Sequence, residues 1–289
     1  MITQGYLSRH FQGRSGMADA ALLDVAQDYA LKHLHDAGVF DLGVVLKGGT
    51  SLRKFRAGNA GRFSTDLDFA APDADVAGLL LDTMEGAELF DVRFRLADRE
   101  ALRAQFVVET PLGQPRIPAR IEISPRALWL PTVLMTPVDL PVHAGYEFTS
   151  PAIPAPALEE SLSEKLAAWR RRRKIRDLYD LDVFGRGGLD EALIRRLLVL
   201  KVWHDVVDDG LGARPFDPAE IVADIDARRL PSEDIGLLTQ PVDPVAWLAR
   251  VRVRYEFVTH LGEVERRVTR CNPGDRYEVS QLIAALSSR

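Results

Sequence analysis

The hydrophobic positions change their spacing about half-way along the chain. In residues 17–38 apolar side chains recur three and four positions apart, which predicts an amphipathic helix. Short apolar runs separated by Gly and Pro follow, and such runs are typical of strands. From residue 158 onward the apolar positions return to helical spacing. The pattern predicts an α/β domain at residues 1–155 and a mostly helical domain at residues 156–289.

The individual elements follow from these runs. Residues 40–46 predict a strand that leads into a Gly-Gly turn, and a helix is expected from Thr50 to Phe55. Further strands are predicted at residues 67–70, 92–96, 104–110, 116–124 and 146–150. Helices of the second domain are predicted at residues 158–174, 175–184, 189–207 and 247–268. Between the domains, three prolines in SPAIPAPALEE, residues 150–160, predict a linker.

Composition and charge narrow the class of protein. The chain has 289 residues, 46% hydrophobic and 27% charged, which is enough apolar material for an ordinary core. A net charge of −5 argues against non-specific coating of nucleic acid by this protein, but a local basic patch could still bind RNA. Cys271 is the single cysteine, no apolar run reaches about 18 residues, and residues 1–16 lack a signal-peptide pattern. We therefore expect a cytoplasmic protein.

The segment LKGGTSLRKF, residues 46–55, combines features that suit an anion. Glycines after a strand let the backbone approach a ligand closely, and the N–H groups of Gly48 and Gly49 can point at it. A helix that opens at Thr50 adds the positive end of its dipole and a hydroxyl donor. We expect this turn to hold the phosphates of a nucleoside triphosphate.

Two carboxylates follow in the segment STDLDF. Asp66 and Asp68 alternate with Leu67, so on a strand both carboxylates project from one face. Neighbouring carboxylates repel each other unless a cation lies between them, and their hard oxygen atoms suit Mg²⁺. With the glycine turn they predict a site where two metal ions activate a hydroxyl and stabilise departing pyrophosphate.

A third acid is expected from a neighbouring strand. Glu122 lies between Ile121 and Ile123 in the segment ARIEIS, as one charge within an apolar strand. The alternative is that Glu122 is only an exposed position on a half-buried strand.

These segments carry a resemblance to a known family. LKGGTSLRKF…RFSTDLDF resembles the signature of nucleotidyltransferases with a polymerase-β-type core, and more narrowly that of the AbiEii/AbiGii-type toxins, including the MenA-like mycobacterial toxins. SEKLAAW, with Lys165, and RRRRKIRDLYDL, with Asp177 and Asp180, resemble the later motifs of that family. Gly-Gly-Thr stands where the superfamily often has Gly-Ser, and threonine keeps the hydroxyl. Beyond about residue 185 no motif is matched.

The resemblance implies an α+β fold, in which a nucleotidyltransferase core with a mixed sheet precedes a mostly helical domain. It implies Mg²⁺ or Mn²⁺ as cofactor and a nucleoside triphosphate as substrate, with Ser64 or Thr65 belonging to the metal-binding motif. The catalytic residues would be Asp66, Asp68, Lys165 and Asp180, the last two contributed by the helical domain. Asp66 and Asp68 would be metal ligands, and Glu122, expected from the strand pattern, would be the third. The nucleotide-binding residues would be Gly48, Gly49, Thr50, Ser51 and Lys165.

The later motifs also have a physical interpretation. Lys165 borders an apolar helix stripe that includes Leu162 and Leu166, from where a lysine can reach a phosphate; the alternative is a surface lysine whose stem covers the stripe. Asp177 and Asp180 are three apart and share a helix face. Asp180 can position Lys165, bind the nucleotide or help to deprotonate the acceptor hydroxyl, and the sequence leaves these three roles open.

A basic run precedes the last of these motifs. Its members concentrate positive charge that the chain as a whole lacks, so they are a candidate binding site for RNA phosphates. The alternative is a solvated helix face. The run comprises Arg170, Arg171, Arg172, Arg173, Lys174 and Arg176.

The resemblance further implies the toxin of a bacterial toxin–antitoxin pair that transfers a nucleoside monophosphate to RNA, with the tRNA 3′ end as leading acceptor. A cognate antitoxin of AbiEi or MenE type would be its partner. Alternatives are a transferase acting on a protein or small molecule, and a non-catalytic nucleotide sensor. The hydroxyls of Thr50, Ser51, Ser64 and Thr65 are predicted either to cap a helix and bind nucleotide, or to carry a silencing phosphate.

Overall fold

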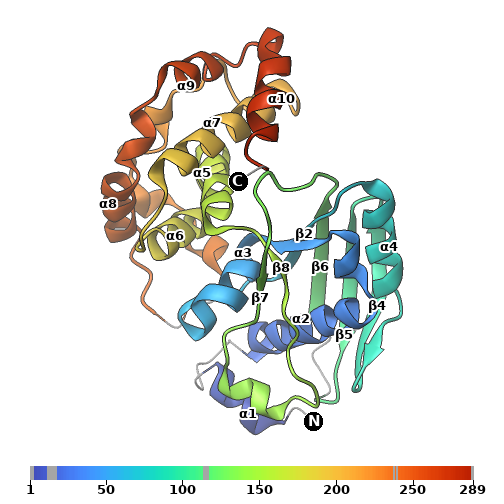
Figure 1. Ribbon diagram of the computed structural model, residues 1–289. Helices are drawn as coiled ribbons and strands as arrows, with labels where there is room; N and C mark the ends of the chain where they lie inside the picture. The colour runs from blue at the N-terminus through green and yellow to red at the C-terminus, as the bar shows by residue number, and fades with distance from the viewer. Residues whose placement is uncertain (1–2, 12–17, 113–116, 237, 239, 288–289) are drawn as a thin grey trace. The chain divides into compact units, whose positions relative to one another are not determined.

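A computed structural model describes residues 3–11, 18–112, 117–236, 238 and 240–287. The chain forms two compact units, whose elements are labelled in Figure 1. Unit 1 contains Met1–Leu128, Thr132–Pro156 and Gly236–Pro241, and unit 2 contains Trp129–Pro131, Ala157–Ile235 and Val242–Arg289. Met17 and Arg116, at the ends of a predicted helix and a predicted strand, lie outside the described residues.

Unit 1 is built on a six-stranded mixed sheet with the strand order β1-β2-β6-β5-β4-β3. Strands β2 and β6 are parallel, and the other neighbouring pairs are antiparallel. A separate antiparallel pair joins β7 to β8. The predicted α+β fold with a mixed sheet is confirmed. The strands are β1 (Val45–Lys47), β2 (Asp66–Ala70), β3 (Glu88–Leu89), β4 (Val92–Glu100), β5 (Arg103–Glu109), β6 (Ile117–Ser124), β7 (Val133–Met135) and β8 (Ile153–Ala155).

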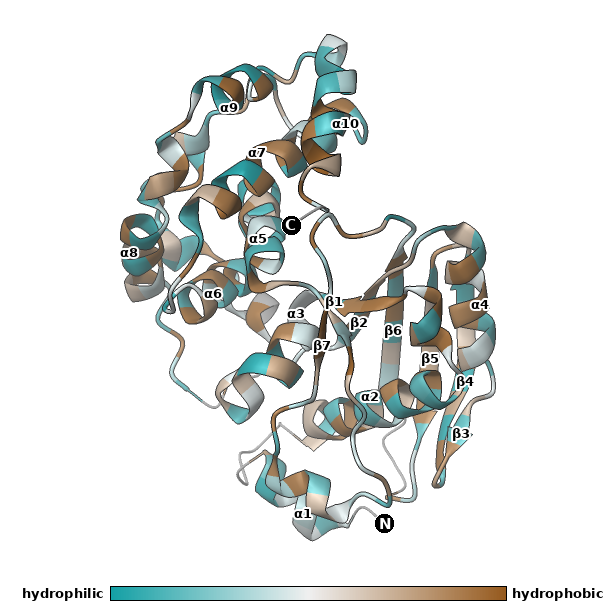
Figure 2. Ribbon diagram, in the orientation of Figure 1, coloured by the Kyte–Doolittle hydropathy of each residue, from teal (hydrophilic) through white to brown (hydrophobic). Residues whose placement is uncertain are grey.

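The two faces of the six-stranded sheet differ in polarity. Figure 2 shows hydrophobic and hydrophilic residues alternating along β6, as expected for a strand with one buried face. Its Ile121 and Ile123 are buried together with Leu67 and Phe69 of β2, in the same core as the apolar sides of helices α2 (Ala18–Asp36) and α4 (Ala74–Met84). Glu122 and Arg120 are exposed on the opposite face. One face therefore carries the core, and the other presents polar groups.

The other helices of unit 1 are short. They are α1 (Gln4–His10), α3 (Gly48–Leu52), the π-helical turn Arg53–Ala57, and the 3₁₀ turns Val39–Leu42, Gly58–Ala60 and Pro141–Gly145. Helix α3 begins directly after β1, and the π-helical turn continues it without a break. The Gly-Gly-Thr segment thus forms the first turn of a helix that leaves the edge of the sheet.

Unit 2 is helical within its described residues. Helices α5 and α7 contribute Trp169 and Trp203, two of the largest fully buried side chains. No helix in the described part of the chain combines the length and the apolar character that a membrane crossing requires. The helices are α5 (Leu158–Arg172), α6 (Ile175–Phe184), α7 (Glu191–Val207), α8 (Pro244–Arg254), α9 (Glu263–Val268) and α10 (Arg276–Ala284).

Four predicted elements are wrong in part. Residues 40–46 contain a 3₁₀ turn before a strand that begins only at Val45, and residues 146–150 form no strand. The predicted linker 150–160 contains β8 and the first residues of α5. Residues 247–268 are divided between α8, a 3₁₀ turn and α9. For residues 40–46 and 146–150, a short apolar run fits a turn as well as a strand, so the local pattern cannot decide.

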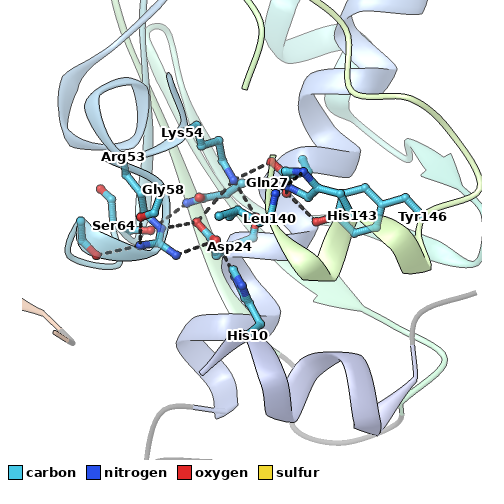
Figure 3. Close-up of polar contacts among 12 residues, drawn as sticks. His10, Asp24, Gln27, Arg53, Lys54, Gly58, Ser64, Leu140, His143 and Tyr146 are labelled. Carbon is cyan, nitrogen blue, oxygen red and sulfur yellow. Dashed lines mark hydrogen bonds and ion pairs between the residues drawn. The ribbon is translucent and has the colours of Figure 1, made fainter. Parts of the chain in front are cut away.

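A buried ion network ties the helix after the glycine turn to α2 (Figure 3). Asp24 accepts two hydrogen bonds from the Arg53 guanidinium, at 2.9 and 3.1 Å, and lies 3.3 Å from Lys54 Nζ. His10 Nε2 lies 2.8 Å from the same carboxylate. One turn later on α2, Asp28 accepts from Lys54 at 2.6 Å. The apparently basic run LRKF thus points its two central cations inward.

Neighbouring charges decide the ionisation of this network. Burial raises the pKa of Asp24, but the charges of Arg53 and Lys54 outweigh it and hold that pKa well below its usual value. Tyr146 donates its hydroxyl proton to Asp28 at 2.5 Å, and burial together with the Asp28 charge raises the pKa of Tyr146 well above its usual value. Asp24 is therefore ionised and Tyr146 neutral at physiological pH.

Asp24→Ala is expected to lower the free energy of unfolding by about 3–5 kcal/mol, because it leaves two buried cations without their counter-charge. Urea unfolding at pH 7 measures the change. Since the folded-state pKa of Asp24 lies below the unfolded-state value, its stabilisation is present above about pH 4 and is lost as the pH falls further. The difference between wild type and variant should therefore narrow in acid.

The control is Asp36→Ala, which removes an exposed ion pair with Lys32 on the same helix. Exposed pairs contribute about 0–1 kcal/mol. Equal losses in the two variants would contradict the role assigned to the buried network.

Candidate active site

The two glycines after β1 occupy positions where a side chain does not fit. Gly48 has a φ of 74°, and a Cβ placed on it would lie 2.1 Å from Asp68 Oδ2. A Cβ on Gly49 would lie 2.4 Å from Nη2 of Arg62. The first position needs glycine for both its conformation and its close approach to a carboxylate. The turn thus brings the Gly48 backbone against the Asp68 carboxylate.

Thr50 connects this turn to the strand that bears the acids. It is fully buried, and its hydroxyl donates a hydrogen bond to the Asp66 carbonyl at 2.5 Å. Ser51 is also buried. This hydrogen bond places the first turn of α3 against the start of β2. The predicted contacts of the Thr50 and Ser51 hydroxyls with a nucleotide stay predictions.

A row of charged residues crosses the open face of the sheet beside this turn. Lys47 on β1 pairs with Asp68 on β2, Asp68 with Glu122 on β6, Glu122 with Arg103 on β5, and Arg103 with Glu100 on β4. Directly paired residues lie on the same face, so these five side chains form one row. They line a cavity of about 520 Å³. This volume is within the range of about 300–1,000 Å³ that small-molecule sites occupy.

Asp66 lies two residues before Asp68 on β2 and therefore on the same face, next to Arg120 of β6. Thr65 Oγ1 is 3.3 Å from Asp66 Oδ1. Among the described residues, no group of three His, Cys, Asp or Glu side chains is arranged closely enough to hold a metal ion. The shared face and carboxylate chemistry of Asp66, Asp68 and Glu122 suit a hard divalent cation, and their role as ligands stays a prediction.

The predicted residues of unit 2 form a buried ion network of their own. Lys165 Nζ lies 2.7 Å from Asp180 Oδ2 and 3.6 Å from Asp177 Oδ1. Arg172 donates two hydrogen bonds to Asp177, at 2.7 and 2.8 Å. Asp177 and Asp180 are almost fully buried, and Lys165 is 9% exposed. The ion pair with Lys165 is the contact that a positioning role of Asp180 requires, and all three roles of Asp180 stay predictions.

The basic run is mostly engaged within unit 2. Arg170 pairs with Glu220 and lies over the Phe216 ring, with its side chain only 4% exposed. Arg173 donates to the Glu220 carbonyl and lies over the Trp169 ring. Arg171 pairs with Asp205 at 3.4 Å, and Arg172 binds Asp177 as described. Lys174 and Arg176 are half-buried. This arrangement supports a structural interpretation of the run more than a free basic surface.

The four hydroxyls near the glycine turn differ in access. Thr50, Ser51 and Ser64 are buried, whereas Thr65 is exposed. A modifying enzyme would therefore reach Thr65 and not the other three without unfolding of the turn.

Sequence reasoning missed two groups of polar residues. Lys47, Arg103 and Glu100 were not singled out, although the alternation in RAQFVVE already marks Arg103 as outward-facing. Asp24 and Asp28 are four residues apart, so they share one face of the amphipathic helix, and that face is its apolar side. Two acids on an apolar face were the available signal for a buried ion network.

Most of the chain is similar to known proteins. The family described as nucleotidyl transferase AbiEii toxin, type IV toxin–antitoxin system, matches residues 30–257. The chain belongs to the AbiEii nucleotidyltransferase toxin family. The resemblance inferred from the motifs is confirmed. No curated protein matches the sequence at a significant level.

Two solved structures resemble this chain to very different degrees, and the first agrees with the AbiEii assignment. MenT4, a nucleotidyltransferase toxin from Mycobacterium tuberculosis H37Rv, is 44% identical to this chain, with a TM-score of 0.94. The match covers 99% of this chain and 100% of that one. JHP933 from Helicobacter pylori is 18% identical, with 97% of this chain and 100% of that chain covered and a TM-score of 0.46. Because the match to MenT4 covers 99% of this chain, it includes the residues beyond 185, where the sequence carries no recognised motif.

Gly48→Ala is expected to reduce nucleotidyl transfer by a factor of about 100 or more, because a methyl group at this position must displace the Asp68 carboxylate and strain the backbone. Turnover of α-labelled nucleoside triphosphate measures the loss, and urea unfolding checks the fold.

The matched control is Gly78→Ala on α4, where a Cβ meets nothing within 4 Å. Removing a helical glycine is expected to stabilise by about 0.5–1 kcal/mol and to leave activity unchanged. Full activity of Gly48→Ala would show that the close approach to Asp68 is not needed.

Proposed function

We propose that this AbiEii toxin transfers a nucleoside monophosphate from a nucleoside triphosphate to the 3′ end of an RNA, with tRNA as the leading acceptor. The observation that carries the proposal is the contact of the Gly48 backbone with Asp68, since it brings a turn suited to phosphates against a carboxylate suited to a divalent cation. The family assignment supports nucleotidyl transfer and a toxin role.

In this proposal, the N–H groups of Gly48 and Gly49 bind the triphosphate, and Asp66, Asp68 and Glu122 hold Mg²⁺ or Mn²⁺. The metal supplies charge stabilisation at the phosphates and lowers the pKa of a bound hydroxyl. Thr50 orients β2 through the Asp66 carbonyl. Lys47, the neighbour of Asp68 on β1, adds a positive charge next to the carboxylates. The chain thus orients the reactants and offsets their charge.

For unit 2, the proposal assigns essential roles to Lys165 and Asp180, as the family resemblance implies. Their 2.7 Å ion pair supports a positioning role for Asp180, because a buried carboxylate restricts the rotamers of the ammonium group. An oriented lysine is a suitable point charge for a phosphate.

Asp68→Ala is expected to abolish transfer of label from α-labelled triphosphate to RNA while the protein stays folded, since the residue is only partly buried. Total RNA is incubated with each α-labelled nucleoside triphosphate, and a labelled band of tRNA size is sought. The control, Asp75→Ala, removes an exposed acid from α4. Undiminished transfer by Asp68→Ala would overturn the assignment of the site.

The same experiment separates the alternative functions. Label on the protein itself would indicate self-modification, and label on a small molecule would indicate that type of acceptor. Tight triphosphate binding without any transfer would indicate a nucleotide sensor. The nucleoside triphosphate that gives the strongest RNA label identifies the base preference.

The family implies an antitoxin partner, and we propose one of AbiEi or MenE type acting in the cytoplasm. Expression of the wild-type chain without the antitoxin is expected to stop bacterial growth, and Asp66→Ala is expected to restore it, because a metal ligand is lost. Growth curves at protein levels matched by immunoblot measure the effect, with Asp75→Ala as a toxic control. Harmless expression of a chain that is active in vitro would indicate a housekeeping transferase.

A further inference from the structure

We propose that the exposed strands β5 and β6 form the docking surface for the acceptor RNA, with Arg103 and Arg120 contacting phosphates near its 3′ end. This inference rests on the proposed function. It names a surface in unit 1, beside Asp68, in place of the basic run of unit 2.

The order of the row across the sheet gives the direction of approach. Asp68 lies between Lys47 and Gly48 on one side and Glu122 and Arg103 on the other. Phosphoryl transfer places the attacking and leaving oxygens in line, on opposite sides of the phosphorus atom. If the glycine turn holds the leaving pyrophosphate, the acceptor hydroxyl approaches from the side of β6 and β5.

Two arginines occupy that side. Arg103 pairs with Glu122 on β6, and Arg120 stands on β6 between Asp66 and Gln105. The side chains of Arg103 and Arg120 are 60% and 49% exposed. Both are on the face of the sheet opposite the buried Ile121 and Ile123, and Arg103 lines the cavity that contains Asp68. An extended RNA strand entering this cavity would pass both guanidinium groups.

The present partners of these arginines leave them able to bind phosphate. Arg103 donates to the exposed Glu100 at 2.6 Å, and Arg120 lies 3.6 Å from the exposed Glu122. Exposed pairs are weak, so a phosphate competes well for either guanidinium. In contrast, Arg172 binds a fully buried carboxylate through two hydrogen bonds, and its release would leave that carboxylate unpaired. Charge and access therefore favour β5 and β6 over the basic run.

The double variant Arg103→Ala/Arg120→Ala tests this surface in the full-length chain. Its KM for tRNA is expected to rise roughly tenfold per arginine, the scale of one charge-assisted hydrogen bond. The loss should appear mainly in the KM for tRNA and much less in kcat at saturating RNA, because both contacts persist from the ground state to the transition state. The slope of log affinity against log salt should fall by about 0.7 for each lost phosphate contact with a single strand.

Two control variants locate the effect. Arg93→Ala removes an exposed arginine that pairs with Glu88 on β3, at the edge of the same sheet, and should leave all constants unchanged. Arg171→Ala removes a partly exposed member of the basic run. Arg171 pairs with Asp205, which is not part of the motif that contains Asp177 and Asp180. If Arg93→Ala raised the KM for tRNA as much as the loss of one of the two proposed arginines, the effect would come from the overall charge of the protein, and the inference would be overturned.

A rise for Arg171→Ala with none for the double variant would place RNA on unit 2 and also overturn the inference. Wild-type chain that labels no RNA at all overturns the proposed function instead, so the two failures are distinct. Urea unfolding of each variant verifies that the fold is retained.

Discussion

Asp24 is a buried carboxylate that two cations from a single helical segment must neutralise. Arg53 and Lys54 reach it from the π-helical turn that continues α3, so the helix after the glycine turn cannot move away from α2 without exposing unpaired charge in the interior. Arg53 also donates to the carbonyls of Gly58 and Gly61, which fixes the chain that returns toward β2. The position of Gly48 against Asp68 depends on this attachment.

The sheet separates stability from chemistry by its two faces. Along β2, Leu67 and Phe69 pack into the core while Asp66 and Asp68 stand on the open face. Because the side-chain period of a strand is two, a slip of one residue in the pairing of β2 with β6 would bury both acids and expose both apolar residues. The same register that forms the core therefore aligns the charged row.

The ion pairs of the two units include two physical classes, buried and exposed. Those of Asp24 with Arg53, and of Asp180 with Lys165, are shielded from water and hold their side chains in one orientation. Those of Arg103 with Glu100, and of Arg120 with Glu122, are exposed and exchange readily with water or a ligand. In the proposed function, the buried pairs hold the catalytic groups in place, and the exposed pairs exchange with the phosphates of the RNA.

The sequence by itself determined the family, the α+β class and the side of β2 that carries the acids, because a glycine pair, a hydroxyl and alternating carboxylates are local signals that survive in any context. It also determined helix α6 to the residue, where an unbroken apolar repeat leaves no competing structure. Only the tertiary structure decided which charges are buried. LRKF and RRRRK look alike as basic runs, yet Arg53 is buried against Asp24. Arg103, which belongs to no basic run, is exposed and lines the cavity that contains Asp68. Burial and pairing of a charge depend on side chains distant in sequence, such as Asp24 for Arg53, so no local pattern contains them.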